Sequence, residues 1–165
     1  MASTEANAVE RLQALTPQVQ AQLQQLVVDS HWNQLPADWA LFHSLGTVYV
    51  VRDGNGFVVG SGAVLPMGAS LGNAAQVSWI SMILVSPLQR GHGLGRAVFA
   101  RCLAQVQAEG RVSMLDATPQ GEALYAQFGF EPQWRFTRWR RQRQAGANGA
   151  LPADDSIDRL QCFDQ

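Results

Sequence analysis

The sequence predicts an α/β fold in one domain over residues 1–143, followed by a linker or tail at 144–165. Three patterns lead to this prediction: two helical segments near the start, a β-hairpin after them, and a unit of strand, glycine-rich loop and helix near the middle. The chain has 165 residues, of which 47% are hydrophobic. This is enough to bury one sizeable core.

The first helix is predicted to begin after Thr16, because Thr16 and Pro17 are typical of an N-cap and a first helical residue. Apolar residues then recur at helical spacing to about Ser30. A second helix is expected after Pro36 and is expected to end at Gly46, where a residue free to adopt positive φ would close it. Only a few residues link the two helices.

Two β-rich runs follow, at 47–52 and 56–65, joined by the turn residues Asp53-Gly54-Asn55-Gly56. Asp, Asn and Gly tolerate the positive φ of tight turns, so the pattern predicts a β-hairpin. The segment 76–85 is predicted to be a strand. Because its second half is almost entirely apolar, we expect burial on both faces.

A helix is predicted over 94–109, after the glycine-rich loop, with Gly110 closing it. Its apolar residues fall on one stripe. The stripe consists of Leu94, Val98, Phe99, Cys102, Leu103 and Val106. We therefore expect Cys102 to be a small core residue rather than part of a disulfide framework.

The last third begins with a short predicted strand at 112–115. A helix should then open at Thr118 and Pro119 and end before Gly129. A final strand is expected from near Phe130 through Trp139, with aromatic side chains facing the core and arginines facing solvent. This arrangement would make the arginine cluster a solvated face rather than a nucleic-acid site.

Composition excludes several classes of function. All twelve basic residues are arginines, so a lysine Schiff base and the lysine of a P-loop are impossible. The net charge of −1 gives no broad field for a polyanion, and we expect no nucleic-acid partner. The N-terminal residues lack the features of a signal peptide, and no apolar run approaches membrane-spanning length. We therefore expect a cytoplasmic protein with no membrane partner.

The glycine-rich loop reads Gln89-Arg90-Gly91-His92-Gly93-Leu94-Gly95-Arg96. Glycines let backbone N–H groups approach a diphosphate at the positive end of the following helix. A dinucleotide fingerprint would need glycine three residues after Gly93, where Arg96 stands. The alternative is a tight strand-to-helix turn that binds nothing.

The loop resembles the acetyl-CoA loop of the GCN5-related N-acetyltransferase (GNAT) superfamily. The pattern Gln/Arg-x-x-Gly-x-Gly/Ala of that family is met by Arg90, Gly93 and Gly95. Residues 79–87 resemble its central strand. Residues 124–130, Leu-Tyr-Ala-Gln-Phe-Gly-Phe, resemble its Leu-Tyr-x-x-x-Gly-Phe ending.

The resemblance covers about residues 47–139 and implies a mixed, mostly antiparallel central sheet flanked by helices, with a central strand that splays before the glycine-rich loop. It implies that the backbone of Ile83 and Val85 pairs with pantetheine and that the Ile83 amide stabilises an oxyanion. Tyr125 would protonate the departing thiolate or hold its sulfur; the alternative is a packing role beside its neighbours on the helix. The implied acetyl-CoA contacts are Ile83, Leu84, Val85, Arg90, Gly91, His92, Gly93, Leu94, Gly95, Arg96 and Thr118.

Two positions depart from the family pattern. Trp79 stands where the family often has a glutamate as general base, and Thr118 stands where it often has an asparagine. The base is therefore unassigned. Asp116 or Glu122 acting through water, or His43, are the candidates, each with an alternative reading as a turn, first-turn or surface residue.

Beyond residue 143 the composition shifts to Ala, Gly, Asn and Pro, which predicts a linker. Ile157, Leu160 and Phe163 then recur at helical spacing. This pattern is vaguely similar to the first helix of another acetyltransferase module, so the tail is either a linker or the start of a second module.

The resemblance implies an enzyme that transfers an acetyl group from acetyl-CoA to an amine by direct attack, without a metal. We expect a small-molecule amine as the acceptor, because the chain lacks an acidic run for recognising basic tails. Selectivity is expected around residues 31–43 and 67–73. The alternative, motivated by Trp79, is a non-catalytic acyl-CoA-binding or regulatory module. The sequence leaves open a homodimer.

Overall fold

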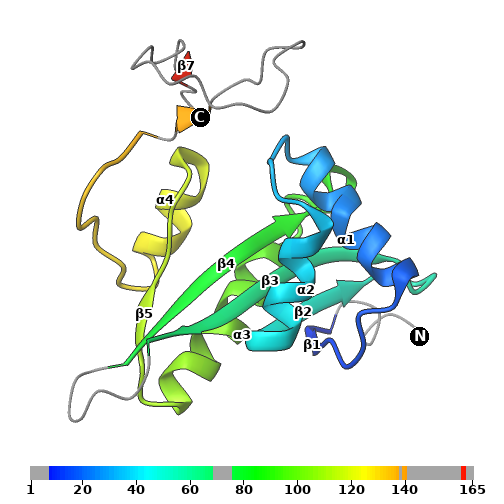
Figure 1. Ribbon diagram of the computed structural model, residues 1–165, viewed down its shortest axis with the longest axis horizontal. Helices are drawn as coiled ribbons and strands as arrows, with labels where there is room; N and C mark the ends of the chain where they lie inside the picture. Colours follow the sequence, from blue (N-terminus) through cyan, green and yellow to red (C-terminus); the bar gives the residue numbers. More distant parts are fainter. Residues whose placement is uncertain (1–7, 69–75, 138, 141–160, 163–165) are drawn as a thin grey trace, which may run out of the picture. The chain divides into compact units, whose positions relative to one another are not determined.

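The computed structural model of the protein describes residues 8–68, 76–137, 139–140 and 161–162. The chain divides into two compact units, residues 1–116 and 117–165. In the described residues, the first unit holds a five-stranded sheet and three α-helices, and the second holds one α-helix and two short strands (Figure 1).

The sheet of the first unit has the strand order β1-β2-β3-β4-β5. Its strands are β1 (Glu10–Arg11), β2 (Thr47–Arg52), β3 (Val58–Met67), β4 (Val77–Val85) and β5 (Val112–Met114). The first four strands pair antiparallel, whereas β5 joins β4 in parallel. This mixed, mostly antiparallel sheet confirms the predicted fold class.

Helices cover both faces of the sheet (Figure 1). They are α1 (Pro17–Asp29), α2 (Pro36–Leu45) and α3 (Leu94–Ala108), as the sequence predicted within one or two residues. On one face, Leu23 of α1 and Trp39 of α2 form a buried core with Val50 and Met82 of the sheet. This core fixes α1 and α2 against the strands.

Helix α3 covers the opposite face with the apolar stripe that the sequence predicted. All six stripe residues, Cys102 among them, are buried. The helix approaches β3 so closely that a Cβ at Gly62 would lie within 3.0 Å of both Val98 and Cys102. A side chain at position 62 would therefore push α3 away from the sheet.

The hairpin turn forms as predicted. The Asp53 carboxylate accepts hydrogen bonds from the amides of Asn55 and Phe57, each at 2.9 Å. Gly56 has φ +81°, which only glycine adopts without strain. These contacts set the register of β2 against β3.

The ending of α2 corrects one expectation. Gly46 does close the helix, and its amide donates to Phe42 O at 3.0 Å, but its φ is −140° rather than positive. Glycine is needed here because a Cβ would clash with the carbonyl oxygen of Val64 on β3. The requirement is therefore close packing, which a single segment of sequence cannot reveal.

Burial of β4 also differs from the prediction. Ser78, Ile80, Met82 and Leu84 are buried, while the residues between them are half-buried. The expected burial on both faces is therefore only partial. The half-buried residues occur on both faces of β4, a strand that β5 pairs over three positions only.

In the second unit, α4 (Pro119–Ala126) begins as predicted, with the Thr118 hydroxyl accepting from the Gly121 amide at 3.3 Å. Gly129 lies just past its end with φ +81°. The local signals for start and end were therefore sufficient for this helix.

The prediction of a strand from Phe130 through Trp139 is wrong. Residues 130–137 form no regular strand, and of the described residues in this stretch only those of β6 (Trp139–Arg140) pair, with β7 (Gln161–Cys162). Pro132 lacks an amide donor, and none of the described residues offers 130–137 a pairing strand. Because residues 130–137 form no strand, the expected separation of aromatic and arginine side chains onto opposite strand faces is also wrong.

The strand β7 also overturns part of the tail prediction. Gln161 and Cys162 are extended rather than helical. The residues that carried the helical spacing, Ile157, Leu160 and Phe163, lie outside the described residues.

Candidate active site

The edge of β4 that faces β5 is paired along only part of its length. Pairing runs from Val77, opposite Val112, to Trp79, opposite Met114. From Ile80 to Val85 no strand among the described residues pairs with this edge, and the two strands diverge (Figure 1). Backbone groups of an edge strand can pair with an extended ligand.

A β-bulge interrupts the pairing of β4 with β3 on its other edge. Ser61 lies opposite Leu84, and Ala63 lies opposite Ser81, so β4 has one extra residue. Met82 within this bulge has φ +56°. The bulge was not predicted from the sequence, where the small residues of β3 at positions 60–63, Gly-Ser-Gly-Ala, were the available signal.

After β4, a short 3-10 helix, η1 (Pro87–Gln89), leads into the glycine-rich loop. Gly91 and Gly93 have φ of +80° and +77°, and a Cβ at either position would meet no atom within 4 Å. The loop therefore needs glycine for its conformation and has open space beside it. Both conditions suit a bound ligand.

Helix α3 begins at Gly93 without a side-chain cap, and its first turn contains no acidic residue. Among the described residues, the amides at this helix start are thus not satisfied by a cap. The positive end of the helix dipole and these donors together favour an anion.

The first turn of α3 packs against the end of β4. A Cβ at Gly95 would lie 3.6 Å from the side chain of Val85, which is ordinary contact. Leu94 is buried, as is Leu84 on the opposite face, so each has only its backbone to offer a ligand. The first turn of α3 therefore lies beside the end of β4 at Val85.

The side chain of Arg90 lies along the end of β4. Its Nε donates to Val85 O at 3.1 Å, and its Nη2 donates to the Ser30 hydroxyl at the end of α1 at 3.4 Å. Arg90 therefore fills one of the two acceptor positions of the Val85 carbonyl oxygen. His92 contacts Gln89 O through Nδ1 at 3.3 Å, a local contact within the loop.

Tyr125 and Thr118 belong to the second unit. The ring of Tyr125 lies over Gly121, where a Cβ would come within 2.8 Å of it, and its centroid is 6.5 Å from that of Phe130. Thr118 accepts from the amide of Gly121 as the cap of α4. The local structure of the Tyr-x-x-x-Gly-Phe segment thus holds the tyrosine between a glycine and a phenylalanine.

The residues of β4, Val-Ser-Trp-Ile-Ser-Met-Ile-Leu-Val, include no ionisable side chain. Strand β4 therefore offers no side chain that could act as a general base. Of the candidates, Glu122 forms an ion pair with Arg135 at 3.4 Å, Asp116 is exposed, and His43 is half-buried on α2.

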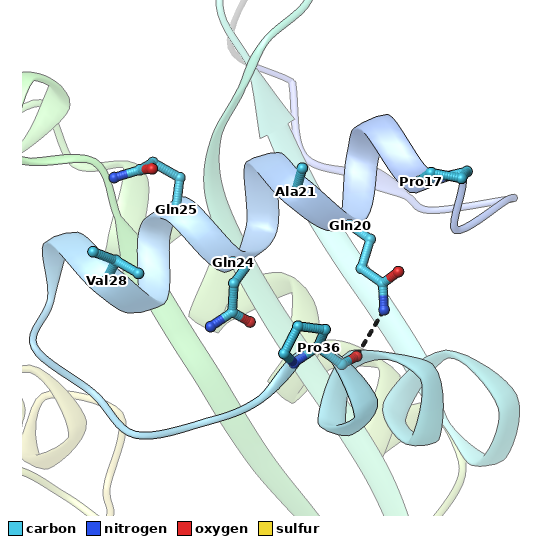
Figure 2. Close-up of a pocket in the computed structure, with 7 residues that line it drawn as sticks. All are labelled: Pro17, Gln20, Ala21, Gln24, Gln25, Val28 and Pro36. Atoms are coloured by element: carbon cyan, nitrogen blue, oxygen red, sulfur yellow. Dashed lines mark hydrogen bonds between the residues drawn. The ribbon is translucent and has the colours of Figure 1, made fainter.

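An open pocket of about 390 Å³ lies on the outer side of α1 (Figure 2). Three glutamines and four apolar residues line it: Gln20, Gln24, Gln25, Pro17, Ala21, Val28 and Pro36. Gln20 Nε2 donates to Pro36 O at 2.8 Å across it. Without an ionisable side chain, this pocket offers no group for proton transfer.

Within the described ranges, no three His, Cys, Asp or Glu side chains gather as metal ligands. None of the helices in those ranges combines the length and hydropathy needed to cross a bilayer.

Comparisons with known proteins agree with this geometry. A family profile described as an acetyltransferase (GNAT) domain matches residues 44–132. Among solved structures, a Trypanosoma brucei acetyltransferase is 21% identical, with a TM-score of 0.64 over 79% of this chain and 98% of its own. A search of curated proteins finds no significant match.

Two further structures show the same fold at lower identity. Glucosamine-6-phosphate N-acetyltransferase from Arabidopsis thaliana is 13% identical, with a TM-score of 0.61 over 85% of this chain and 98% of its own. A predicted acetyltransferase with acetyl-CoA from Clostridium acetobutylicum is also 13% identical, with a TM-score of 0.60 over 78% of this chain and 95% of its own. The family match spans more than half of the chain, and the chain therefore belongs to the GNAT acetyltransferase family.

Proposed function

We propose that the protein transfers an acetyl group from acetyl-CoA to a small-molecule amine while both substrates are bound, with residues 1–143 as the catalytic domain. The observation that carries the proposal is the unpaired edge of β4 leading into the uncapped start of α3. The edge suits the extended pantetheine arm, and the helix start suits the diphosphate.

Each part of acetyl-CoA has a proposed partner in the chain. The amides of residues 91–96 bind the diphosphate, with the positive charge of Arg96 nearby. The backbone of 83–85 pairs with pantetheine, and the Ile83 amide donates to the thioester oxygen as it gains negative charge. Arg90, through its contacts with Val85 and Ser30, holds the loop in place.

In the proposed reaction, the amine nitrogen attacks the thioester carbon and the C–S bond breaks. Tyr125 donates a proton to the departing sulfur, while the amine loses a proton to water or to Asp116, Glu122 or His43. Thr118, which caps α4, is proposed to contact the cofactor as well. The sequence lacks an acidic run for recognising a basic protein tail, which supports a small acceptor.

A non-catalytic acyl-CoA-binding module is the second candidate, because β4 carries Trp79 where many family members have a glutamate. Steady-state release of CoA, measured with a panel of small amines, separates the two. We expect release with at least one class of amine. Tight acetyl-CoA binding without release across the panel would favour the binding module.

A further inference from the structure

A buried serine hydroxyl holds a backbone carbonyl at the bulge between β3 and β4. Ser61 on β3 is completely buried, and its Oγ donates to the carbonyl oxygen of Met82 at 2.9 Å. Met82 adopts φ +56°, a left-handed conformation that is unfavourable for a non-glycine residue. Such a conformation persists only where neighbouring groups hold it.

The register explains why this carbonyl needs a side-chain partner. Between the pairs Ser61–Leu84 and Ala63–Ser81, one residue of β3 faces two residues of β4. Such a bulge disrupts the ladder locally and leaves one residue without its regular bonds. A buried carbonyl without a donor is destabilising, and the Ser61 hydroxyl supplies that donor.

The same hydrogen bond sets the direction of the next amide. The Met82 carbonyl and the Ile83 N–H belong to one peptide group, and no cis peptide bond occurs in the described residues. In a planar trans peptide, the C=O and N–H bonds point in opposite directions. Because Ser61 draws the carbonyl towards β3, the Ile83 N–H is directed away from β3, towards the edge that β5 leaves open after Trp79.

We propose that Ser61 is a positioning residue that, through the Met82 carbonyl, aims the Ile83 N–H at the thioester oxygen of acetyl-CoA. The identity of that oxygen rests on the proposed function. The hydrogen bond also polarises the peptide group and strengthens its N–H as a donor. No proton passes from Ser61 to the substrate, and Ser61 does not touch it.

Selective labelling tests the direction of this amide without requiring turnover. The chain contains three isoleucines, Ile80, Ile83 and Ile157, so ¹⁵N-isoleucine gives three amide signals, with Ile80 an internal reference on the same strand. In the wild type, acetyl-CoA should shift the Ile83 signal strongly. In Ser61→Ala, that shift should shrink or vanish.

Kinetics provide the second readout. Removing one oxyanion donor costs about 10²–10³ in kcat, so a misdirected donor in Ser61→Ala should lower kcat by roughly 10-fold to 100-fold with little change in the KM for acetyl-CoA. Ser61→Thr keeps the hydroxyl and should restore most of kcat. If Ser61→Ala does not fold, Ser61→Cys, which has a weak donor of similar size, should show the same loss.

Ser78→Ala is the matched control. Ser78 is also completely buried on the sheet, and its hydroxyl accepts from Arg111 Nε at 2.7 Å, away from the bulge. It should lose comparable stability while keeping kcat and the Ile83 shift. If Ser61→Ala keeps both as well, Ser61 has only a structural role. A wild type that releases no CoA with any amine would contradict the proposed function, whereas the Ile83 shift would still decide the role of Ser61.

Discussion

Helices α1 and α3 pack on opposite faces of one sheet, yet their N-termini differ. At α1, the Thr16 hydroxyl accepts from the Val19 amide at 3.3 Å, and Pro17 removes a further donor. At α3, Gly93 supplies no side chain, and the first turn has no acidic residue. The first amides of α1 are therefore bound by a cap from its own sequence, whereas those of α3 lack such a cap and are proposed to bind an anion.

The uncapped start of α3 lies next to the unpaired edge of β4. Its first turn packs beside Val85, at the end of the strand whose edge is unpaired after Trp79. One end of the proposed ligand site is thus a set of helix amides, and the other is a strand edge. A ligand with an anionic part and an extended amide-containing part, as in acetyl-CoA, matches both.

The start of α3 keeps its place beside β4 only if the helix stays packed on the sheet, and the reactivity of the buried Cys102 tests this packing. Burial raises the pKa of the Cys102 thiol from 9.0 to about 12. At pH 8 the reactive thiolate should therefore be roughly a thousand-fold rarer than in the unfolded chain. We expect slow alkylation of native Cys102 by mass spectrometry and fast alkylation after unfolding. Fast native labelling would show that α3 opens readily.

The same raised pKa has a consequence for stability. The stability that the protonated Cys102 thiol contributes is fully present below pH 9, the ordinary pKa of the thiol, and it is lost as the pH rises towards about 12. The free energy of unfolding of Cys102→Ala should therefore fall less than that of the wild type between pH 9 and about pH 12.

The open start of α3 can be given an acidic residue. Gly95 does not have positive φ, and its Cβ would make ordinary contact with Val85. Gly95→Glu should raise the melting temperature, because glutamate favours a first turn, and weaken acetyl-CoA binding by about 100-fold or more. Gly95→Ala, the control, should gain stability and keep its affinity. Unchanged acetyl-CoA affinity in Gly95→Glu would show that the diphosphate does not bind at this turn.

Helix α4, like α1, has a capped start, so its first turn is not proposed to bind the diphosphate. Its proposed contribution is the proton that Tyr125 donates to the departing thiolate. Tyr125→Phe keeps the ring over Gly121 and beside Phe130 and removes only the hydroxyl. We expect kcat to fall by roughly 100-fold while acetyl-CoA affinity persists. A thioester with a more acidic thiol should restore much of the loss. Wild-type turnover by Tyr125→Phe would make it a packing residue.

The smallest effect is expected at α1. Thr16→Ala removes the cap that accepts from Val19 and should lower the free energy of unfolding by about 1 kcal/mol. Because this helix start satisfies its own donors, acetyl-CoA affinity should not change. A loss of affinity without unfolding would mean that α1 contributes directly to the cofactor site.

Local signals in the sequence predicted the helices and the hairpin well. Thr16 and Thr118 proved to be caps, and the stripe that contains Cys102 proved to be the buried side of α3. These features depend on residues close in sequence, so spacing and residue type suffice to find them. The glycine-rich loop likewise has the positive φ values that make glycine necessary.

Features that depend on a neighbouring strand were missed or misjudged. The bulge at Met82 arises from the register of β4 on β3, and the need for Gly46 arises from the Val64 carbonyl. The strand expected near Phe130 lacks a described partner, although its alternation suggested one. Strand pairing is non-local, and a single sequence does not encode it in adjacent residues.

The central claim is that the loop at the start of α3 binds the diphosphate of acetyl-CoA, and the two ends of α3 allow a matched test. Gly93 and Gly110 have φ of +77° and +63°, and a Cβ at either would meet no atom within 4 Å. Gly93→Glu and Gly110→Glu therefore introduce similar strain, bulk and charge at opposite ends of one helix. By calorimetric titration, we expect acetyl-CoA affinity to fall by about 100-fold or more in Gly93→Glu and to stay at the wild-type value in Gly110→Glu, with similar losses of melting temperature. Equal affinities in the two variants would contradict the claim.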